Sequence, residues 1–297
     1  MRILVSGASG LLGGAIRPAL NTAGHSTAAL VRRSPTDDEV QWNPAQPLDP
    51  LRLSPFDSII HLAGKNIAGR WTEPFKREVR DSRIGGTQTL ATAAAESFRQ
   101  TGTPRIFVAA SAVGYYGDRG DELLTEQSQP GSGFLADVCQ EWERATAIAA
   151  EAGIRVVNLR IGVVLARQGG ALKAMLPAFR LGLGGPVGSG RQFWSWIGLA
   201  DLVNLFLFAL TNESLRGPVN AVAPNPARNA EFTRILAAIL RRPAIFPLPA
   251  FVVKALFGEM GESLLLASAR VAPAQLQAVG YVFRHPDLAE ALRSILE

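Results

Sequence analysis

Short apolar runs alternate with longer helical patterns along the first half of the chain. The apolar runs read as buried strands at Ile3–Val5, Thr27–Val31, Ser58–Leu62, Arg105–Ala110 and Val156–Leu159. The helical patterns span Leu11–Ala23, Ile84–Gln100 and Phe134–Ala152. Glycines follow the first and the last of these helices, as is typical of a helix end. The alternation predicts βαβ units, and therefore an α/β fold with a doubly wound parallel sheet covered on both faces.

The pattern changes after Leu165, where loops and glycines replace the regular alternation. A helical pattern at Leu199–Asn212 and a strand-like run at Pro218–Val222 follow, and we expect both to return to the first sheet. The remaining segments are predicted to form a smaller lobe over the strand ends, with a short helical module in the C-terminal tail. The predicted division is residues 1–165 with 199–222 in the sheet domain, and 166–198 with 223–297 in the lobe.

The composition is that of an ordinary globular chain, with 47% hydrophobic and 19% charged residues. The net charge of +5 is spread over single and paired cations, so the sequence predicts no nucleic-acid partner. The single cysteine, Cys139, excludes an internal disulfide, and the three histidines lack zinc-type spacing, which predicts no metal site. No apolar run reaches a membrane span and no signal peptide is apparent, so we expect a cytoplasmic protein without a membrane partner.

A glycine-rich segment, Gly7–Gly13, follows the first strand and opens the first helix with the spacing G-x-x-G-x-x-G. Gly7 would allow a tight turn, Gly10 a close approach of backbone to a pyrophosphate, and Gly13 close packing of helix on strand. The alternative is a plain glycine turn. The strand before it and the helix after it favour a dinucleotide site. The predicted contacts are Gly7, Ser9, Gly10, Leu11, Leu12 and Gly13.

The second strand ends in Arg32 and Arg33, and no acidic residue occurs before Asp37. In the dinucleotide fold an acid at this point holds the ribose 2′-hydroxyl of NAD, whereas an arginine accommodates the 2′-phosphate of NADP. The alternative is that both arginines are solvated surface cations. We expect NADP as the cofactor, with Arg32 on its 2′-phosphate.

Several further motifs resemble those of the extended short-chain dehydrogenase/reductase superfamily. More closely, the sequence is similar to an atypical branch of epimerase family proteins, and the similarity covers nearly the whole chain. The resemblance implies a Rossmann-like fold, NADP binding and an oxidoreductase or epimerase activity. The motifs are Gly7–Gly13, His61–Ala68, Arg70–Thr72, Asp81–Ile84, Ser111–Gly117, Leu181–Pro186, Arg191–Ile197, Ala223–Pro226, Leu248–Pro249 and Phe257–Glu259.

The resemblance also implies cofactor contacts outside the glycine-rich loop. Three residues directly after the third strand would line the cofactor, and three more match positions where the branch contacts NADP. The first three are Leu62, Ala63 and Gly64, and the second three are Glu78, Arg83 and Arg160.

The acid–base group usual in this superfamily, Tyr-x-x-x-Lys with an upstream serine, is missing. Counting back from Glu143 places Leu135 and Cys139 at the Tyr and Lys positions, and shifting the frame by one gives Phe134 and Val138. Neither frame supplies the required side chains. Cys139 lies in an apolar helix interior, so we interpret it as a packed thiol and not as a nucleophile.

Ser111 and Tyr116 near the end of the fourth strand are the remaining catalytic candidates. Tyr116 would donate a proton with Arg83 supplying positive charge, and Ser111 would orient the substrate, although a one-residue register choice would place Ala112 there instead. Tyr115 is predicted to contact the substrate. The alternative for the two tyrosines is an aromatic wall of the pocket.

Arg191 and Trp194 follow a glycine-rich loop and are predicted to bind an anionic substrate, unless Trp194 belongs to a structural cluster. We expect an NADP-binding oxidoreductase or epimerase acting on a small polar substrate, such as a nucleotide sugar. Because Tyr-x-x-x-Lys is missing, the alternative is an NADP-binding regulatory protein without turnover. We expect a monomer or a homodimer, the latter through the Ala-rich helices.

Overall fold

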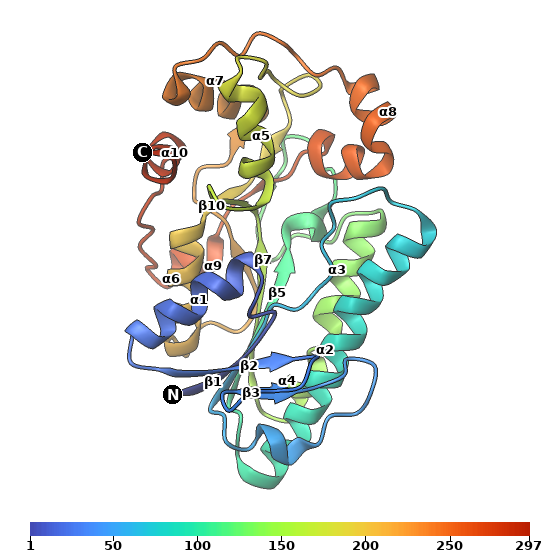
Figure 1. Ribbon diagram of the computed structural model, residues 1–297, viewed down its shortest axis with the longest axis vertical. Coiled ribbons are helices and arrows are strands. Elements are labelled where there is room, and N and C mark those ends of the chain that lie inside the picture. The colour runs from blue at the N-terminus through green and yellow to red at the C-terminus, as the bar shows by residue number, and fades with distance from the viewer.

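The computed structural model describes all 297 residues, and seven parallel strands form its central sheet (Figure 1). The strand order reverses between β1 and β4, which defines a doubly wound sheet with its switch point there. The predicted fold class is confirmed. In spatial order the strands are β11 (Gly217–Ala221), β7 (Arg155–Ile161), β5 (Ile106–Ala112), β4 (Ser58–His61), β1 (Arg2–Ser6), β2 (Ser26–Val31) and β3 (Glu39–Gln41).

Helices cover both faces of the sheet, so both faces of each central strand are buried (Figure 1). Ile3 and Val5 of β1 belong to the core on one face, and Leu4 between them belongs to the core on the other. This explains why the strands read as continuous apolar runs. One face carries α1 (Leu11–Thr22) and α6 (Leu199–Thr211), and the other carries α2 (Glu73–Thr101), α3 (Phe134–Arg144) and α4 (Ala147–Glu151).

In the sheet domain and the helices that cover it, the start of one helix, the continuity of another and one additional strand of the central sheet differ from the prediction. α2 begins at Glu73 and not at Ile84, because the Thr72 hydroxyl caps it by accepting a hydrogen bond from the Phe75 amide. Its first turns are largely charged, which hid them from a hydrophobic pattern. The predicted helix over 134–152 is broken into α3 and α4, and the three-residue strand β3 was too short to be predicted.

The lobe has its own core, to which α5 (Gly170–Arg180), α7 (Asn229–Leu240) and α10 (Leu288–Leu296) each contribute one face. Short strand pairs join it to the sheet domain, and β13 pairs in parallel with β6, a segment that follows β5. None of the helices combines the length and apolar composition that crossing a membrane requires. The elements are η1 (Pro50–Leu53), η2 (Val113–Tyr116), β6 (Leu123–Leu124), β8 (Val163–Leu165), α5 (Gly170–Arg180), β9 (Phe193–Trp194), β10 (Trp196–Gly198), β12 (Ala227–Arg228), α7 (Asn229–Leu240), α8 (Ala250–Gly261), η3 (Glu262–Leu266), β13 (Arg270–Val271), α9 (Ala274–Ala278) and α10 (Leu288–Leu296).

Candidate functional site

The loop between β1 and α1 is closely packed at two of its glycines and open at the third. Gly7 has a φ of +66°, and a Cβ there would lie 2.8 Å from the carbonyl carbon of Leu62. A Cβ on Gly13 would lie 2.4 Å from the carbonyl oxygen of Gly7, so only glycine allows α1 to pack so close to this turn. Gly10 is exposed, and a Cβ there would meet only the Gly7 oxygen, at 3.3 Å. No side chain caps α1, so the backbone N–H groups of its first turn are left available to an anionic ligand such as phosphate.

The other three loop residues differ in burial. Ser9 is exposed, whereas Leu11 and Leu12 are half-buried. Leu11 lies against Gly169, where an added Cβ would be 2.9 Å from the leucine Cδ1. This contact places the loop against the segment that leads into the lobe.

Ser6, directly before the loop, ties β1 to the end of β4. Its hydroxyl accepts hydrogen bonds from the amides of Leu62 and Ala63, at 3.0 and 3.2 Å. It therefore donates its own proton to Nδ1 of His61, at 2.7 Å. The ring then carries its proton on Nε2, which donates to the Thr87 hydroxyl at 3.0 Å. This buried relay fixes the backbone of Leu62 and Ala63 beside the glycine-rich loop.

The relay makes the stability of the fold sensitive to acid. Burial lowers the pKa of His61 to about 4, whereas in the unfolded chain it lies near 6.5. The unfolded chain therefore binds the extra proton first, and stability is lost as the pH falls from about 6.5 toward 4. We expect this residue to lower the free energy of unfolding by about 2 kcal/mol between pH 7 and pH 5. Urea denaturation of wild type and His61→Asn checks this, and an equal pH dependence in both proteins would contradict it.

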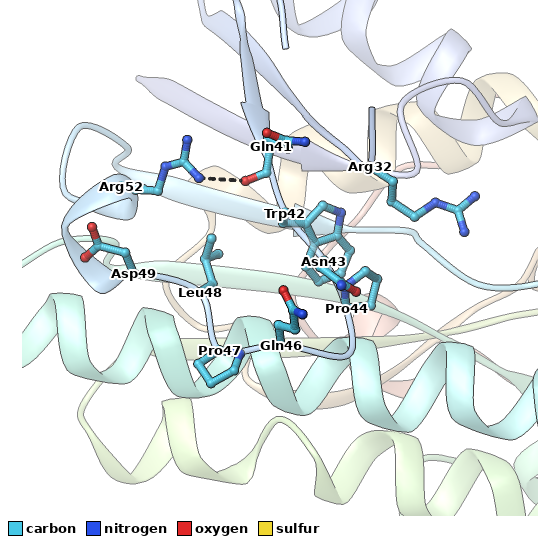
Figure 2. Close-up of a pocket in the computed structure, with 10 residues that line it drawn as sticks. All are labelled: Arg32, Gln41, Trp42, Asn43, Pro44, Gln46, Pro47, Leu48, Asp49 and Arg52. Atoms are coloured by element: carbon cyan, nitrogen blue, oxygen red, sulfur yellow. Dashed lines mark hydrogen bonds between the residues drawn. The ribbon is translucent and has the colours of Figure 1, made fainter. Parts of the chain in front are cut away.

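Of the two arginines after β2, only Arg32 keeps its guanidinium unpaired. Arg33 forms a salt bridge with Glu39, with 2.6 Å between Nη2 and Oε1. Arg32 makes no hydrogen bond or salt bridge and lines an open hollow of about 700 Å³. Figure 2 shows Arg32 and Arg52 at opposite ends of this hollow. An unpaired guanidinium at the end of β2 is available to an anionic group of a ligand.

The floor of this hollow comes from residues that the sequence analysis missed. Gln41 ends β3, and Trp42, Asn43 and Pro44 follow it along the hollow (Figure 2). Trp42 is buried, with its ring edge-on to His61 at 6.2 Å between centroids. The sequence offered one sign of this hollow, namely a tryptophan, a polar residue and a proline in succession at Trp42–Pro44, not far beyond the second strand.

Arg83 lies beside Gly64, in the segment after β4 that is predicted to line the cofactor. Its Nη1 donates to the carbonyl oxygen of Lys65 at 2.9 Å, and its Cγ lies 3.4 Å from where a Cβ on Gly64 would be. Its guanidinium also stacks over Trp142, at 5.1 Å from the ring centroid. Glu78, in contrast, is exposed and forms a salt bridge with Lys65. Both residues stay predicted cofactor contacts. Arg83 is held by the backbone and by Trp142, whereas Glu78 is exposed and contacts only Lys65.

Arg160 and Glu143 form a buried two-pronged salt bridge beneath the end of β7. The distances are 2.8 Å from Nε to Oε1 and 2.8 Å from Nη2 to Oε2, and Arg160 is only 3% exposed. The Ser111 hydroxyl donates to the same carboxylate at 2.7 Å. This geometry opposes the predictions that Arg160 contacts NADP directly and that Ser111 orients a substrate. Arg160 and Ser111 both point toward the Glu143 carboxylate, because a buried carboxylate is costly unless hydrogen-bond donors surround it.

The two tyrosines of η2 lie in different surroundings. Tyr116 is fully buried, with its hydroxyl 2.7 Å from Oδ1 of Asn220 and 2.9 Å from Nη1 of Arg160. Burial raises the pKa of Tyr116 to about 12. This opposes its predicted role as proton donor, because the group is both inaccessible and harder to ionise. Tyr115 is half-buried, its hydroxyl makes no hydrogen bond, and its ring packs under Arg160 at 3.5 Å. Tyr115 is therefore the tyrosine available to a substrate.

Apolar side chains occupy the helix positions where the usual Tyr and Lys would stand. A Cβ on Gly114 would lie 3.3 Å from the Cβ of Leu135 and 3.8 Å from the Sγ of Cys139, so α3 packs directly beneath η2. Cys139 is buried, and burial raises the pKa of its thiol to about 12. The interpretation of Cys139 as a packed thiol is confirmed.

Two arginines lie over Phe193 in the lobe, and a third, Arg191, precedes it by two residues. The guanidiniums of Arg228 and Arg270 lie over the Phe193 ring, at 4.3 and 5.2 Å from its centroid. Arg228 also donates to the carbonyl oxygen of Arg191 at 2.5 Å. Asp121, the acid in this cluster, forms a salt bridge with Arg228, and its pKa is lowered chiefly by that bond. The cluster keeps an excess of positive charge near Arg191.

Trp194 lies in the core of the lobe and not on its surface. It is 7% exposed and packs against Phe232, with 5.5 Å between the ring centroids. Its indole N–H has no hydrogen-bond partner. The structure thus favours the alternative of a structural tryptophan over the predicted substrate contact.

Comparison with known proteins finds matches over nearly the whole chain. A model of the "NAD dependent epimerase/dehydratase family" matches residues 3–221, and a "Domain of unknown function (DUF1731)" matches residues 248–295. A Mycobacterium bovis protein named as an epimerase family protein is 43% identical over 98% of this chain and 96% of its own length. The human epimerase family protein SDR39U1 is 39% identical, with both chains covered completely.

Solved structures agree with the fold. The crystal structure of human SDR39U1 (isoform 2) with NADPH matches with a TM-score of 0.91 and 38% identity, over 99% of both chains. A structure described as the nucleoside-diphosphate sugar epimerase from Corynebacterium glutamicum matches with a TM-score of 0.83 and 38% identity, over 100% of this chain and 58% of that one. A UDP-N-acetylglucosamine 4-epimerase from Bacillus cereus shares the fold at 17% identity.

Proposed function

The chain belongs to the NAD dependent epimerase/dehydratase family, and from this premise we propose that it binds NADP and acts as an oxidoreductase or epimerase. The observation that carries the preference for NADP is the unpaired Arg32 at the end of β2. A guanidinium offers paired hydrogen bonds to phosphate, whereas the ribose hydroxyls of NAD would call for a carboxylate here. Human SDR39U1, crystallised with NADPH, supports the same choice.

The residues present fit this cofactor. The open N-terminus of α1 at Gly10 would hold the pyrophosphate, and Arg32 the 2′-phosphate. The hollow beside Trp42 and Asn43 would bind the adenosine of the cofactor. The backbone of residues 62–64 after β4, against which Arg83 packs, would contact the nicotinamide and its ribose. When bound, the nicotinamide would supply or accept a hydride.

Arg32→Ala tests the cofactor preference. We expect the variant to bind NADPH at least about tenfold more weakly, because a charge-assisted hydrogen bond is worth about 1.5–3 kcal/mol. Binding of NADH should change little. Arg33→Ala is the matched control, since Arg33 is paired with Glu39. Fluorescence titration measures all four affinities, and an equal loss for both cofactors in Arg32→Ala would overturn the assignment.

We propose a small polar, anionic substrate, such as a nucleotide sugar. Support comes from the arginine cluster around Phe193 and from the unbonded hydroxyl of Tyr115. Arginine suits phosphate and carboxylate groups because its planar fork of N–H donors matches their oxygens. Screening carbonyl compounds and nucleotide sugars for NADPH oxidation or epimer formation identifies the substrate.

A second candidate function is NADP-dependent regulation without turnover. It is favoured by the apolar side chains that both frames place at the usual Tyr and Lys positions, either Leu135 and Cys139 or Phe134 and Val138, and by the inward-facing hydroxyls of Ser111 and Tyr116. In that case the protein would bind NADPH tightly and yet convert no compound in the screen.

A further inference from the structure

Two stretches of the lobe carry only positive charge. Residues 167–200 contain Arg167, Lys173, Arg180 and Arg191 but no Asp or Glu, and residues 232–258 contain Arg234, Arg241, Arg242 and Lys254 but no Asp or Glu. The whole chain has 30 basic and 25 acidic residues, so this one-sided distribution is not the general composition. Lys254 is paired with Glu262 just beyond the second stretch, but the remaining cations of the two stretches form no salt bridge within them, so a surface that includes both stretches attracts anions.

The same two stretches hold most of the large apolar side chains that the protein leaves exposed. They follow α5, lie in the linker between α7 and α8, or lie on α8 itself. Six of them are more than half exposed, which is unusual for so many apolar residues close together in sequence in a protein surrounded only by water. We call these side chains the apolar rim: Leu181 (74%), Leu183 (58%), Ile245 (71%), Phe246 (55%), Phe251 (73%) and Leu256 (67%).

Backbone hydrogen bonds hold the two stretches side by side at one end of the molecule. The amide of Phe246 donates to Gly184 at 3.2 Å, and the amide of Leu248 donates to Pro186 at 2.9 Å. The Nε of Arg242 donates to the carbonyl oxygen of Arg180 at 3.0 Å. In Figure 1 the linker from α7 to α8 runs over the end of the lobe, past α5. These contacts hold the linker that carries Ile245 and Phe246 beside the segment that carries Leu181 and Leu183, and the linker leads directly into α8, which carries Phe251 and Leu256.

Arg180, Arg241 and Arg242 beside the rim take part in no salt bridge. Proteins that bind the surface of an anionic membrane combine exposed apolar side chains with unpaired cations. The apolar side chains insert at the boundary between headgroups and acyl chains, and the cations are attracted to the anionic headgroups. A second copy of this chain fits poorly, because it would bring like charges face to face.

The geometry points to a peripheral docking surface for anionic lipid at this end of the lobe. The expectation of no membrane partner rested on the absence of an apolar span, but docking on a membrane surface needs none. The chain would lie on the membrane through the apolar rim and would keep the cofactor hollow, which is lined by residues 32–52 of the sheet domain, outside the contact.

Sedimentation of the full chain with vesicles tests the proposal. We expect it to bind vesicles of phosphatidylcholine mixed with phosphatidylglycerol, and to bind pure phosphatidylcholine at least about tenfold more weakly. The double variant Ile245→Ser and Phe246→Ser should lose at least about tenfold in partitioning, because it removes two inserted side chains. Arg180→Gln with Arg241→Gln should lose about fivefold per charge at low salt.

Two exposed sites elsewhere supply matched controls. Val282→Ser removes an apolar side chain that is 86% exposed, and Arg99→Gln removes an exposed cation at the end of α2. Both controls should bind anionic vesicles as wild type does, and all variants should keep the wild-type thermal unfolding temperature. Equal binding to neutral and anionic vesicles, or wild-type binding by the double serine variant, would overturn the proposal. So would a wild-type dimer in solution that the double serine variant abolishes, because it would assign the rim to a second copy.

Discussion

Gly10→Val is expected to abolish NADPH binding, with an affinity loss of at least about a hundredfold. The branched side chain would fill the open approach to the N-terminus of α1 and separate the pyrophosphate from the backbone N–H groups. Losing two charge-assisted hydrogen bonds at about 1.5–3 kcal/mol each gives a loss of this size. The fold should survive, because Gly10 has an extended backbone (φ −77°, ψ 175°) and a Cβ there meets only one atom, at 3.3 Å.

Gly14→Val is the matched control for this substitution. Gly14 lies one turn along α1, is exposed, and would bring its Cβ within 4 Å of nothing. It should therefore keep wild-type affinity for NADPH. Calorimetric titration of both variants, together with their thermal unfolding, separates binding from folding. Wild-type NADPH affinity in Gly10→Val would show that this loop is not the phosphate site.

Arg160→Met is expected to destabilise the fold by about 3–5 kcal/mol, the usual effect of removing one partner of a buried ion pair. Glu143 would keep a carboxylate in an environment where its side chain is only 12% exposed, with Ser111 as its remaining partner. Tyr116 would also lose the N–H of Arg160 from its hydroxyl. Urea denaturation at pH 7 measures the change in the free energy of unfolding.

The double variant Arg160→Met with Glu143→Gln distinguishes a charge effect from a packing effect. It leaves no unpaired charge, so it should recover most of the stability that the single variant loses. A single-variant loss below about 1 kcal/mol would show that water reaches the pair, as it reaches surface salt bridges. A double variant as unstable as Arg160→Met would instead place the loss in the packing of Arg160 against Tyr115.

The central strands and the glycine-rich loop were predictable because each is specified by local sequence. Both faces of the sheet are buried, so every central strand is an unbroken apolar run. At Gly7 and Gly13 any Cβ would collide with neighbouring backbone atoms, so only glycine fits and its presence in the sequence marks the loop. The charged first turns of α2 carry no such signal, and their start depends on the hydroxyl cap at Thr72.

The candidate site was less predictable, because its chemistry depends on which way neighbouring side chains point. Tyr115 and Tyr116 share a short turn, and nothing in their spacing tells which one faces the core. The inward orientation of Ser111 depends on Glu143, which is 32 residues away. Arg32 and Arg33 were likewise equivalent in sequence, and only the position of Glu39 on the edge strand separates them.

The pairing of β13 with β6 joins segments about 150 residues apart, Arg270 to Leu123 and Val271 to Leu124. Such a non-local pairing forms late, since the long intervening chain must first be ordered. While the ribosome is still making the C-terminal region, Leu123 and Leu124 of β6 therefore lack the strand with which they pair in the folded protein. The sheet domain would then reach its final set of strand pairs only after about the last thirty residues, which include β13, have left the ribosome.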